Sequence, residues 1–300
     1  MSENKMNRWQ RDYGLQARML MTLFMLAAVY LLFLYALWLF GGVDTYSLIF
    51  IAGIMLFLQF FFSDKLALWG VGGRIVNEQE APHLHEMISR LCAEADLPKP
   101  KIAIVESSVP NAFATGRSRG SAVVAVTTSL MQRLTQAEVE AVLAHELSHV
   151  KNRDMLVITI ASFLSTAAFF IVRNMLFFGI GGRDRNRNAG AAMMVWLISL
   201  VVWILSFLLI RALSRYREFA ADRGSALITG HPKHLISALM NISGMMERVP
   251  ARDLRDVEGM NAFFIIPALS GDSIMNLFST HPPIEERILA LEEIDRGMGI

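Results

Sequence analysis

Hydrophobic residues gather into four long runs along the chain, separated by mixed segments. Two uncharged runs lie near the N-terminus, at 19–40 and 46–62, and two more lie at 155–172 and 190–210. The first run is long enough to cross a bilayer core of about 30 Å as a helix. The segment 179–190 is polar and glycine-rich, which predicts a loop. The pattern therefore predicts two apolar hairpins that contribute about four transmembrane helices.

Each hairpin has a simpler alternative. The first run could be a cleaved signal peptide, but it is too long, and no small-residue cleavage site follows it before the second run. The second pair of runs could instead be a buried helix pair in a soluble core. We favour membrane contact for both hairpins.

Basic residues beside the runs predict their orientation, because cytoplasmic flanks are enriched in lysine and arginine. The N-terminal tail carries Lys5, Arg8, Arg11 and Arg18, whereas the connector 41–45 carries no basic residue. This places the N-terminus and the segment after 62 in the cytoplasm. The tip of the second hairpin carries Arg173, Arg183, Arg185 and Arg187. That hairpin either crosses fully against the rule or enters the bilayer only partly, and we favour full crossing.

The two mixed segments, 64–154 and 211–300, predict a soluble domain of the α+β class. Helical periodicity predicts a helix within 80–97, and the stretches 101–107 and 121–130 are typical of strands. A turn, a short extended piece and a second turn lie between the strands. The segment after 211 is mostly helical, with long irregular connections.

A second helix begins at Gln136, because Thr135 and Glu138 form a capping-box pattern in front of it. The chain then divides into a tail (1–18), a transmembrane hairpin (19–63), the first part of the soluble domain with the helix 136–153 (64–154), a second hairpin (155–210) and the second part of the soluble domain (211–300).

The helix 136–153 carries the spacing H-E-x-x-H. His145 and His149 lie one turn apart on one face, and two imidazoles in that arrangement supply two corners of a zinc tetrahedron. Glu146 lies beside them and can reach a water at the metal without being a ligand, as metal-assisted hydrolysis requires. The alternative is a solvated helix face with a coincidental histidine pair. We favour a zinc site.

A catalytic zinc site needs a third protein ligand and one open position. Glu218 is the best candidate, on a helix expected to continue the last apolar run without a break. Asp222 lies one turn beyond Glu218 and could accept the free N–H of a ligand histidine. The alternative is an ordinary charged helix face with Arg211 and Arg215, whose ion pairs stabilise little.

Composition excludes other classes of site. The chain is 54% hydrophobic, its formal net charge is +1, and Cys92 is its one cysteine. A near-zero net charge gives no indication of nucleic-acid binding. One cysteine allows neither a disulfide framework nor a cysteine-rich zinc module.

Four motifs in this order carry a family resemblance: "PNAFATG", "HELSHVKNRDM", "EFAADRG" and "STHPPIEERI". Together they resemble the HtpX family of bacterial membrane-embedded zinc metalloproteases, which are related to CAAX prenyl endopeptidases. The resemblance implies a gluzincin-like domain with one Zn²⁺ per chain, held by His145, His149 and Glu218, with Glu146 as catalytic base. It also implies a multi-pass endopeptidase of the inner membrane that faces the cytoplasm and acts in quality control and stress response.

Two of these motifs suggest further roles. "PNAFATG" resembles the edge strand of the family's substrate cleft, formed here by Asn111, Ala112, Phe113 and Ala114, on which an extended peptide could pair its backbone. A plain turn and strand is the alternative. His281 in "STHPP" could donate to an oxyanion, or could be a packing or capping residue. Arg287 could hold Asp222 or substrate.

The partners expected are polypeptide substrates, especially membrane proteins, and the lipid bilayer. Two other functions stay open. A CAAX-type prenyl-protein endopeptidase is ranked lower, because four apolar runs are too few for the large enclosed chamber that this group resembles. A membrane scaffold with a structural zinc would need a fourth protein ligand, and none with suitable spacing is evident.

Overall fold

The computed structural model describes residues 13–41, 68–178, 189–246 and 281–298, and a few single positions between 50 and 61. The chain divides into two compact units. The first comprises residues 1–12, 62–156 and 214–300, and the second comprises residues 13–61 and 157–213.

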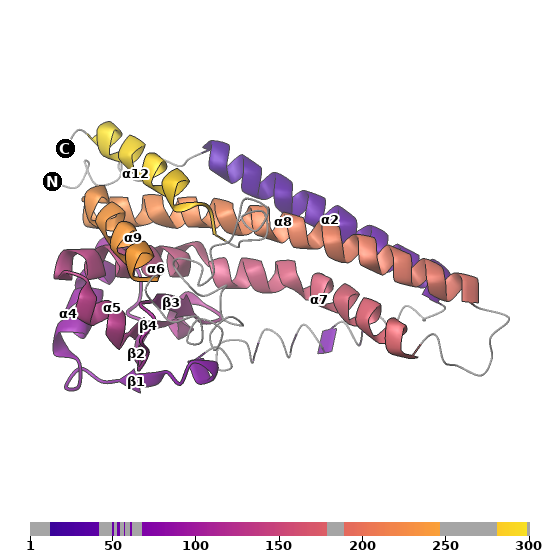
Figure 1. Ribbon diagram of the computed structural model, residues 1–300, viewed down its shortest axis with the longest axis horizontal. Coiled ribbons are helices and arrows are strands. Elements are labelled where there is room, and N and C mark those ends of the chain that lie inside the picture. Colours follow the sequence, from indigo (N-terminus) through magenta and orange to yellow (C-terminus); the bar gives the residue numbers. More distant parts are fainter. Residues whose placement is uncertain are drawn as a thin grey trace. The chain divides into compact units, whose positions relative to one another are not determined.

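The first unit contains a mixed sheet with the strand order β1-β2-β4-β3 (Figure 1). Its strands are β1 (Arg74–Val76), β2 (Lys101–Val105), β3 (Ala112–Thr115) and β4 (Val123–Thr127). β2 and β4 are parallel, and β1 and β3 pair antiparallel with them as the two edge strands. β2 and β4 form within the stretches predicted as strands and β3 is the short extended piece between them, whereas β1 was not predicted.

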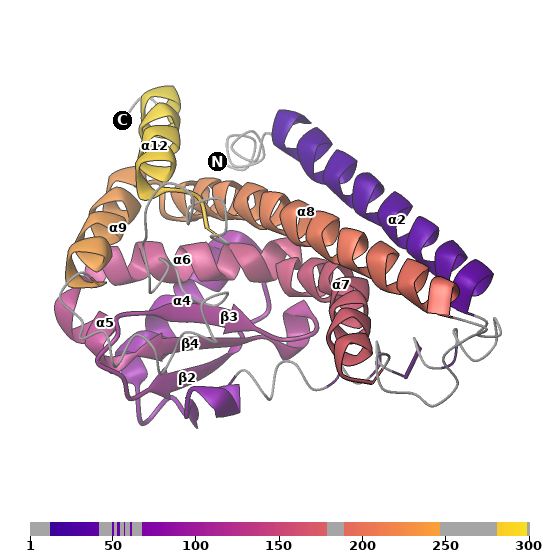
Figure 2. The same ribbon diagram turned by 45° about the vertical axis from the view of Figure 1, so that its right-hand side comes forward.

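Five helices of the described chain complete this unit: α4 (Pro82–Ala95), α5 (Thr128–Arg133), α6 (Gln136–Asn152), α9 (Pro232–Met246) and α12 (Ile284–Met298). α6 lies alongside β3 and packs against α4 and α9, and α9 packs against α12 (Figure 2). α5 begins within the last three residues of the stretch 121–130, which was expected to continue as strand. The Thr127 hydroxyl accepts a hydrogen bond from the Leu130 N–H and so begins this short helix.

The capping box predicted at the start of α6 is present. The Thr135 hydroxyl accepts from the Glu138 N–H at 3.4 Å, and the Glu138 carboxylate accepts from the Thr135 N–H at 2.8 Å. The other oxygen of Glu138 accepts hydrogen bonds from Ser237 and Asn241 of α9, at 2.5 and 2.6 Å. Glu138 therefore begins α6 and also joins it to α9.

Two further helices join the units. α7 (Asp154–Phe178) follows α6 after a single residue, Arg153, whose left-handed backbone (φ 57°) ends α6. α8 (Ala189–Thr229) carries both the last apolar run and the charged segment after it, so the expected unbroken helix is confirmed. Its residues from 214 onward belong to the first unit.

The second unit is formed by α2 (Tyr13–Gly41) and by the parts of α7 and α8 that lie between 157 and 213. Its core contains Leu26, Tyr30 and Phe33 of α2 together with residues of α7 and α8, and the Tyr30 hydroxyl donates a hydrogen bond to the Ala161 carbonyl. Large apolar side chains on α2, such as Leu20, Phe24 and Leu31, are more than two-thirds exposed. Such exposure is typical of a surface that contacts lipid or a partner.

The expectation of four transmembrane helices is corrected by the described residues. Two helices there are long and apolar enough to cross a membrane, at Tyr13–Leu39 and Met193–Thr229. Most of the run 46–62, and several side chains of the run at 155–172 in α7, lie outside the described residues. Over the described residues, the protein is thus a helical domain with a small mixed sheet and two long apolar helices, where four were expected.

Candidate metal centre

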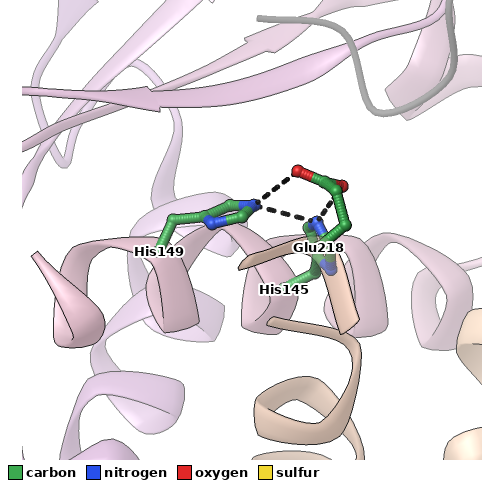
Figure 3. A group of neighbouring side chains, drawn as sticks. All are labelled: His145, His149 and Glu218. Atoms are coloured by element: carbon green, nitrogen blue, oxygen red, sulfur yellow. Dashed lines mark hydrogen bonds and ion pairs between the residues drawn. The ribbon is translucent and has the colours of Figure 1, made fainter. Parts of the chain in front are cut away.

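His145, His149 and Glu218 converge, although Glu218 lies 69 positions after His149. The two Nε2 atoms lie 3.1 Å apart, His145 Nε2 lies 3.5 Å from Glu218 Oε2, and His149 Nε2 lies 3.5 Å from Glu218 Oε1 (Figure 3). The histidines come from α6 and the glutamate from α8. His145 and Glu218 are buried, and His149 is mostly buried.

A close approach of α6 and α8 makes this convergence possible. Gly224 of α8 lies against Ser148 of α6, and a Cβ atom on Gly224 would lie only 2.7 Å from the Ser148 Cβ. One residue further along α8, the Ser225 hydroxyl donates a hydrogen bond to the Ala141 carbonyl of α6 at 2.7 Å. Glu218 and Asp222 lie on the same helix within two turns of Gly224 and are thereby brought to the histidines.

Each histidine has a carboxylate at its outer nitrogen. His145 Nδ1 lies 2.9 Å from Asp222 Oδ1, and His149 Nδ1 is hydrogen-bonded to Asp154 Oδ2 at 2.6 Å. A carboxylate at Nδ1 favours the tautomer whose proton is on Nδ1, which leaves the Nε2 lone pair for a metal. Both Nε2 atoms face Glu218, so the tautomers and the geometry agree.

The two carboxylates are themselves neutralised by arginines. Arg287 donates to Asp222 through Nε and Nη2, at 2.8 and 2.6 Å, and Arg217 Nε lies 3.1 Å from Asp154 Oδ1. Arg287 is 1% exposed, and its Nη1 also lies 3.6 Å from Glu218 Oε2, so that loss of Asp222 would remove the closest partner of a buried charge. Of the two roles considered for Arg287, the structure shows the contact with Asp222.

The donor set fits a zinc ion. Bonds of 2.0–2.1 Å in a tetrahedron separate the ligand atoms by about 3.3 Å. The two Nε2 atoms lie 3.1 Å apart, and each lies 3.5 Å from a different oxygen of Glu218. One ligand atom from each residue lies within 4.8 Å of the other two, which is close enough for one ion to draw them together. Oε2 of Glu218 is buried and has no well-aligned hydrogen bond from the described residues, although His281 Nδ1 lies 3.2 Å from it. Two imidazoles and one carboxylate that leave a fourth position to water or substrate are typical of catalytic rather than structural zinc.

Burial and neighbouring charges shift the pKa values at the site. Burial lowers the pKa of His145, but contacts with the carboxylates of Asp222 and Glu218 outweigh it and raise the pKa to about 9. For Asp154, burial acts in the opposite direction and raises the pKa. The charge of Arg217 and the hydrogen bond to His149 outweigh this effect and bring the pKa of Asp154 below its ordinary value. A proton on His145 competes with a metal for Nε2, so metal binding must release it.

Glu146 lies between the two histidines along α6, buried, and is not among the three converging residues. Its Oε2 accepts a hydrogen bond from the Ala114 N–H of β3 at 2.9 Å. Burial raises the pKa of Glu146, although the charges of His149 and His145 oppose the shift. A carboxyl with a raised pKa can both accept and return a proton near neutral pH.

β3 presents part of its backbone to the same site. The Thr127 N–H donates to the Asn111 carbonyl at 2.9 Å, so Asn111 and Thr127 are a hydrogen-bonded pair of the ladder. Ala112 and Ala114 are then non-bonded positions, whose N–H and C=O groups point away from β4. The bond from Ala114 to Glu146 agrees with this alternation.

Comparison with known proteins identifies the family. Residues 78–295 match Peptidase family M48. The chain is 63% identical to Protease HtpX homolog 2 of Methanosarcina acetivorans, covering 97% of this chain and 99% of that one. The chain belongs to the HtpX family of M48 zinc metalloproteases. It is also 58% identical to the Protease HtpX homolog of Moorella thermoacetica, covering 96% of each chain.

A solved structure shares the fold. Ste24p of S. mikatae superposes with a TM-score of 0.54, at 18% identity, covering 93% of this HtpX-family chain and 67% of that chain. The family shows that the protein is a metallopeptidase that acts on polypeptides. The Methanosarcina relatives are archaeal, so relatedness does not assign the chain to a bacterium.

The remaining residues considered from the sequence occupy the same region of the HtpX-family domain. Asn111 is buried, and its N–H donates to the Thr127 hydroxyl at 2.8 Å, so its backbone anchors the start of β3. His281 is buried, with Nδ1 at 3.2 Å from Glu218 Oε2. Phe113 points into a small cluster with Ala103 and Val105, on the sheet face away from the main core.

Sequence reasoning missed Asp154 and Arg217. Asp154 was given no role from the sequence beyond ending the first soluble segment, 64–154. The signal that could have found it is an aspartate five positions after His149, directly after the residue that ends the helix. A chain that turns at that point can bring a short carboxylate back to the last turn.

Proposed function

We propose that this protein is a membrane-embedded endopeptidase that hydrolyses peptide bonds of misfolded or damaged membrane proteins, with one zinc ion per chain. The observation that carries the proposal is the convergence of His145, His149 and Glu218 beside Glu146. An apolar helix leads directly into this site, because Glu218 lies on α8 a few residues after the apolar run.

In the mechanism, each residue has one task. When bound, zinc polarises the scissile carbonyl and makes a water molecule more acidic. Glu146 takes the proton of that water as it attacks, and then delivers the proton to the leaving amine. Asp222 and Arg287 hold His145 in place. His281 Nδ1 lies 3.2 Å from Glu218 Oε2, and we assign to His281 a hydrogen bond to the oxyanion.

Substrate recognition is assigned to the backbone of β3. The outward N–H and C=O groups of Ala112 and the outward C=O of Ala114 can pair with an extended peptide, as an added strand at the sheet edge, whereas the Ala114 N–H is bonded to Glu146. Glu146 bonds to Ala114 at this edge, so a paired peptide would lie within reach of the base. Backbone pairing carries little sequence preference, which suits an enzyme that removes damaged proteins of many sequences.

We assign the protein to the membrane of a prokaryotic cell, with the N-terminus and the catalytic domain in the cytoplasm. The two candidate membrane helices and the basic N-terminal tail support this placement. A substrate can then be bound either from the membrane or from the cytoplasm, because the site lies at the end of an apolar helix.

The proposal is tested with purified full-length protein in mild detergent. We expect casein and an unfolded membrane protein to be cleaved internally, 1,10-phenanthroline to stop cleavage, and added zinc to restore it. A folded membrane protein serves as the control and should be cleaved slowly. Cleavage that resists the chelator would contradict the zinc mechanism, and equal cleavage of folded and unfolded membrane proteins would contradict the quality-control role.

The alternative is a CAAX-type prenyl-protein endopeptidase, which the fold similarity to Ste24p favours. A matched pair of peptides, farnesylated and unmodified, separates the two functions. Our proposal expects similar rates for both peptides, whereas the alternative requires the farnesylated peptide to be cleaved far faster.

A further inference from the structure

Each of the two ligand histidines is contacted by a buried carboxylate that pairs with an arginine. Of the two carboxylates, only Asp222 was predicted from the sequence. His145 is backed by Asp222 and Arg287, and His149 is backed by Asp154 and Arg217. In each set a buried carboxylate contacts Nδ1 and an arginine neutralises the carboxylate. The first set takes Asp222 from α8 and Arg287 from α12, and the second takes Asp154 from α7 and Arg217 from α8.

Asp154 reaches His149 because of the turn between α6 and α7. The left-handed Arg153 ends α6, and its N–H donates to the carbonyls of His149 and Val150. Asp154 follows as the first residue of α7 and is 1% exposed. Its two oxygens divide between two side chains, Oδ2 at His149 and Oδ1 at Arg217.

A simpler interpretation is that Asp154 only stabilises the N-terminus of α7. Acidic residues are favourable in the first turn of a helix because they face its partial positive charge. That role needs neither burial nor a side-chain partner. The 2.6 Å bond to an imidazole and the ion pair with an arginine from another helix indicate a more specific task.

We propose that Asp154 is a positioning residue for the metal centre, which holds His149 with Nε2 toward the zinc. Arg217 forms an ion pair with Asp154 and precedes the ligand Glu218 directly. The Asp154–Arg217 pair therefore ties the end of α6, which carries His149, to the part of α8 that carries Glu218. It lies within three residues of both points where the chain passes between the two units, at 156 and 214.

The inference rests on the proposed zinc site, and its test is metal binding by the apoprotein rather than activity. Full-length protein in detergent is stripped of metal and titrated with Co²⁺, and Zn²⁺ affinity follows from competition with a chromophoric chelator. We expect Asp154→Ala to weaken zinc binding about 10- to 100-fold, as loss of a carboxylate behind a ligand histidine does. Asp154→Asn should weaken it less, because the amide oxygen still accepts from Nδ1.

The cobalt spectrum distinguishes a positioning role from a general loss of stability. In Asp154→Ala the free rotation of His149 should change the intensity and position of the visible d–d bands. Arg217→Gln, which leaves Asp154 in place, should give a smaller change in the same direction. Glu138→Gln is the control on α6, the helix that carries His149. This variant should lower the stability of the protein while leaving its metal affinity and cobalt spectrum unchanged.

If Asp154→Ala does not fold, the isosteric Asp154→Asn and Arg217→Gln variants decide the matter by the same two measurements. Zinc affinity within twofold of the wild type in the Asp154 variants, with an unchanged cobalt spectrum, would overturn the inference. If the wild-type protein itself binds neither metal at this site, the proposed function fails and the inference fails with it.

Discussion

Gly224 of α8 and Ser148 of α6 lie so close that the glycine cannot carry a side chain without moving one of the helices. A Cβ atom on Gly224 would lie 2.7 Å from the Ser148 Cβ, well inside the distance that real Cβ atoms adopt. Ser148 directly precedes His149, and Gly224 lies two residues after Asp222. The spacing of the two helices at this point therefore sets the spacing of the metal ligands.

Gly224→Ala should separate α6 from α8 and weaken the metal centre. Overpacking a tight contact costs about 1–3 kcal/mol. If the strain is relieved by moving α8, zinc affinity should fall about tenfold or more. The measurement is Zn²⁺ affinity of the apoprotein by competition with a chelator.

Gly244→Ala is the matched control for that substitution. Gly244 lies in α9, and a Cβ atom there would meet nothing within 4 Å. The variant should keep wild-type zinc affinity and gain about 0.5–1 kcal/mol of stability. Equal zinc affinities for the two alanine variants would contradict the role given to the close contact.

Glu138 should give the protein a stability that depends on pH. Burial raises its pKa, but hydrogen bonds from Ser237, Thr135 and Asn241 lower it more, so its folded pKa lies below the ordinary value. A lowered folded pKa stabilises the protein above the unfolded pKa, and this stability is lost as pH falls through the folded pKa. Glu138→Gln should therefore destabilise by about 1–2 kcal/mol at neutral pH.

Thermal unfolding of the two proteins in detergent across pH measures this difference. The difference in unfolding temperature between the wild type and Glu138→Gln should be constant above about pH 5. It should become smaller at lower pH, where the wild-type carboxyl gains its proton. A gap that is independent of pH would show that the substitution acts only through the shape of the cap.

Backbone pairing along β3 predicts an alternating requirement for substrate N–H groups. In a short peptide that the protein cleaves, N-methylation at every second residue near the scissile bond should raise KM strongly, because those N–H groups pair with the strand. Methylation at the intervening positions is the control and should be tolerated. A similar rise in KM after N-methylation at successive residues would contradict binding of the peptide as an added strand.

Local patterns predicted some parts of the site from sequence, whereas contacts between distant segments stayed hidden. Two features lie within one helix: the capping box of Thr135 and Glu138, and the spacing of His145 and His149. Local patterns of this kind can be recognised in a single sequence. Glu218 could be predicted because a catalytic zinc site needs a third ligand, and because the helix that continues the last apolar run carries a charged face.

The contacts missed are those that a turn or a helix crossing creates. Asp154 meets His149 only because Arg153 adopts a left-handed conformation, which no pattern indicated. The role of Gly224 depends on which residue of α6 it crosses. β1 is three residues long, too short for a periodic signal. Length and composition alone counted four membrane helices where the described residues contain two.

The most direct test of the account is Glu146→Gln, measured for zinc content and for cleavage on the same preparation. Glu146 lies beside the metal ligands without being one of them, so the variant should bind one zinc ion per chain as the wild type does. Its cleavage of casein should fall by roughly 10²- to 10⁴-fold, because the general base is lost. Wild-type cleavage by the zinc-loaded variant, or loss of zinc from it, would contradict the assignment of Glu146 as the base of a metalloprotease.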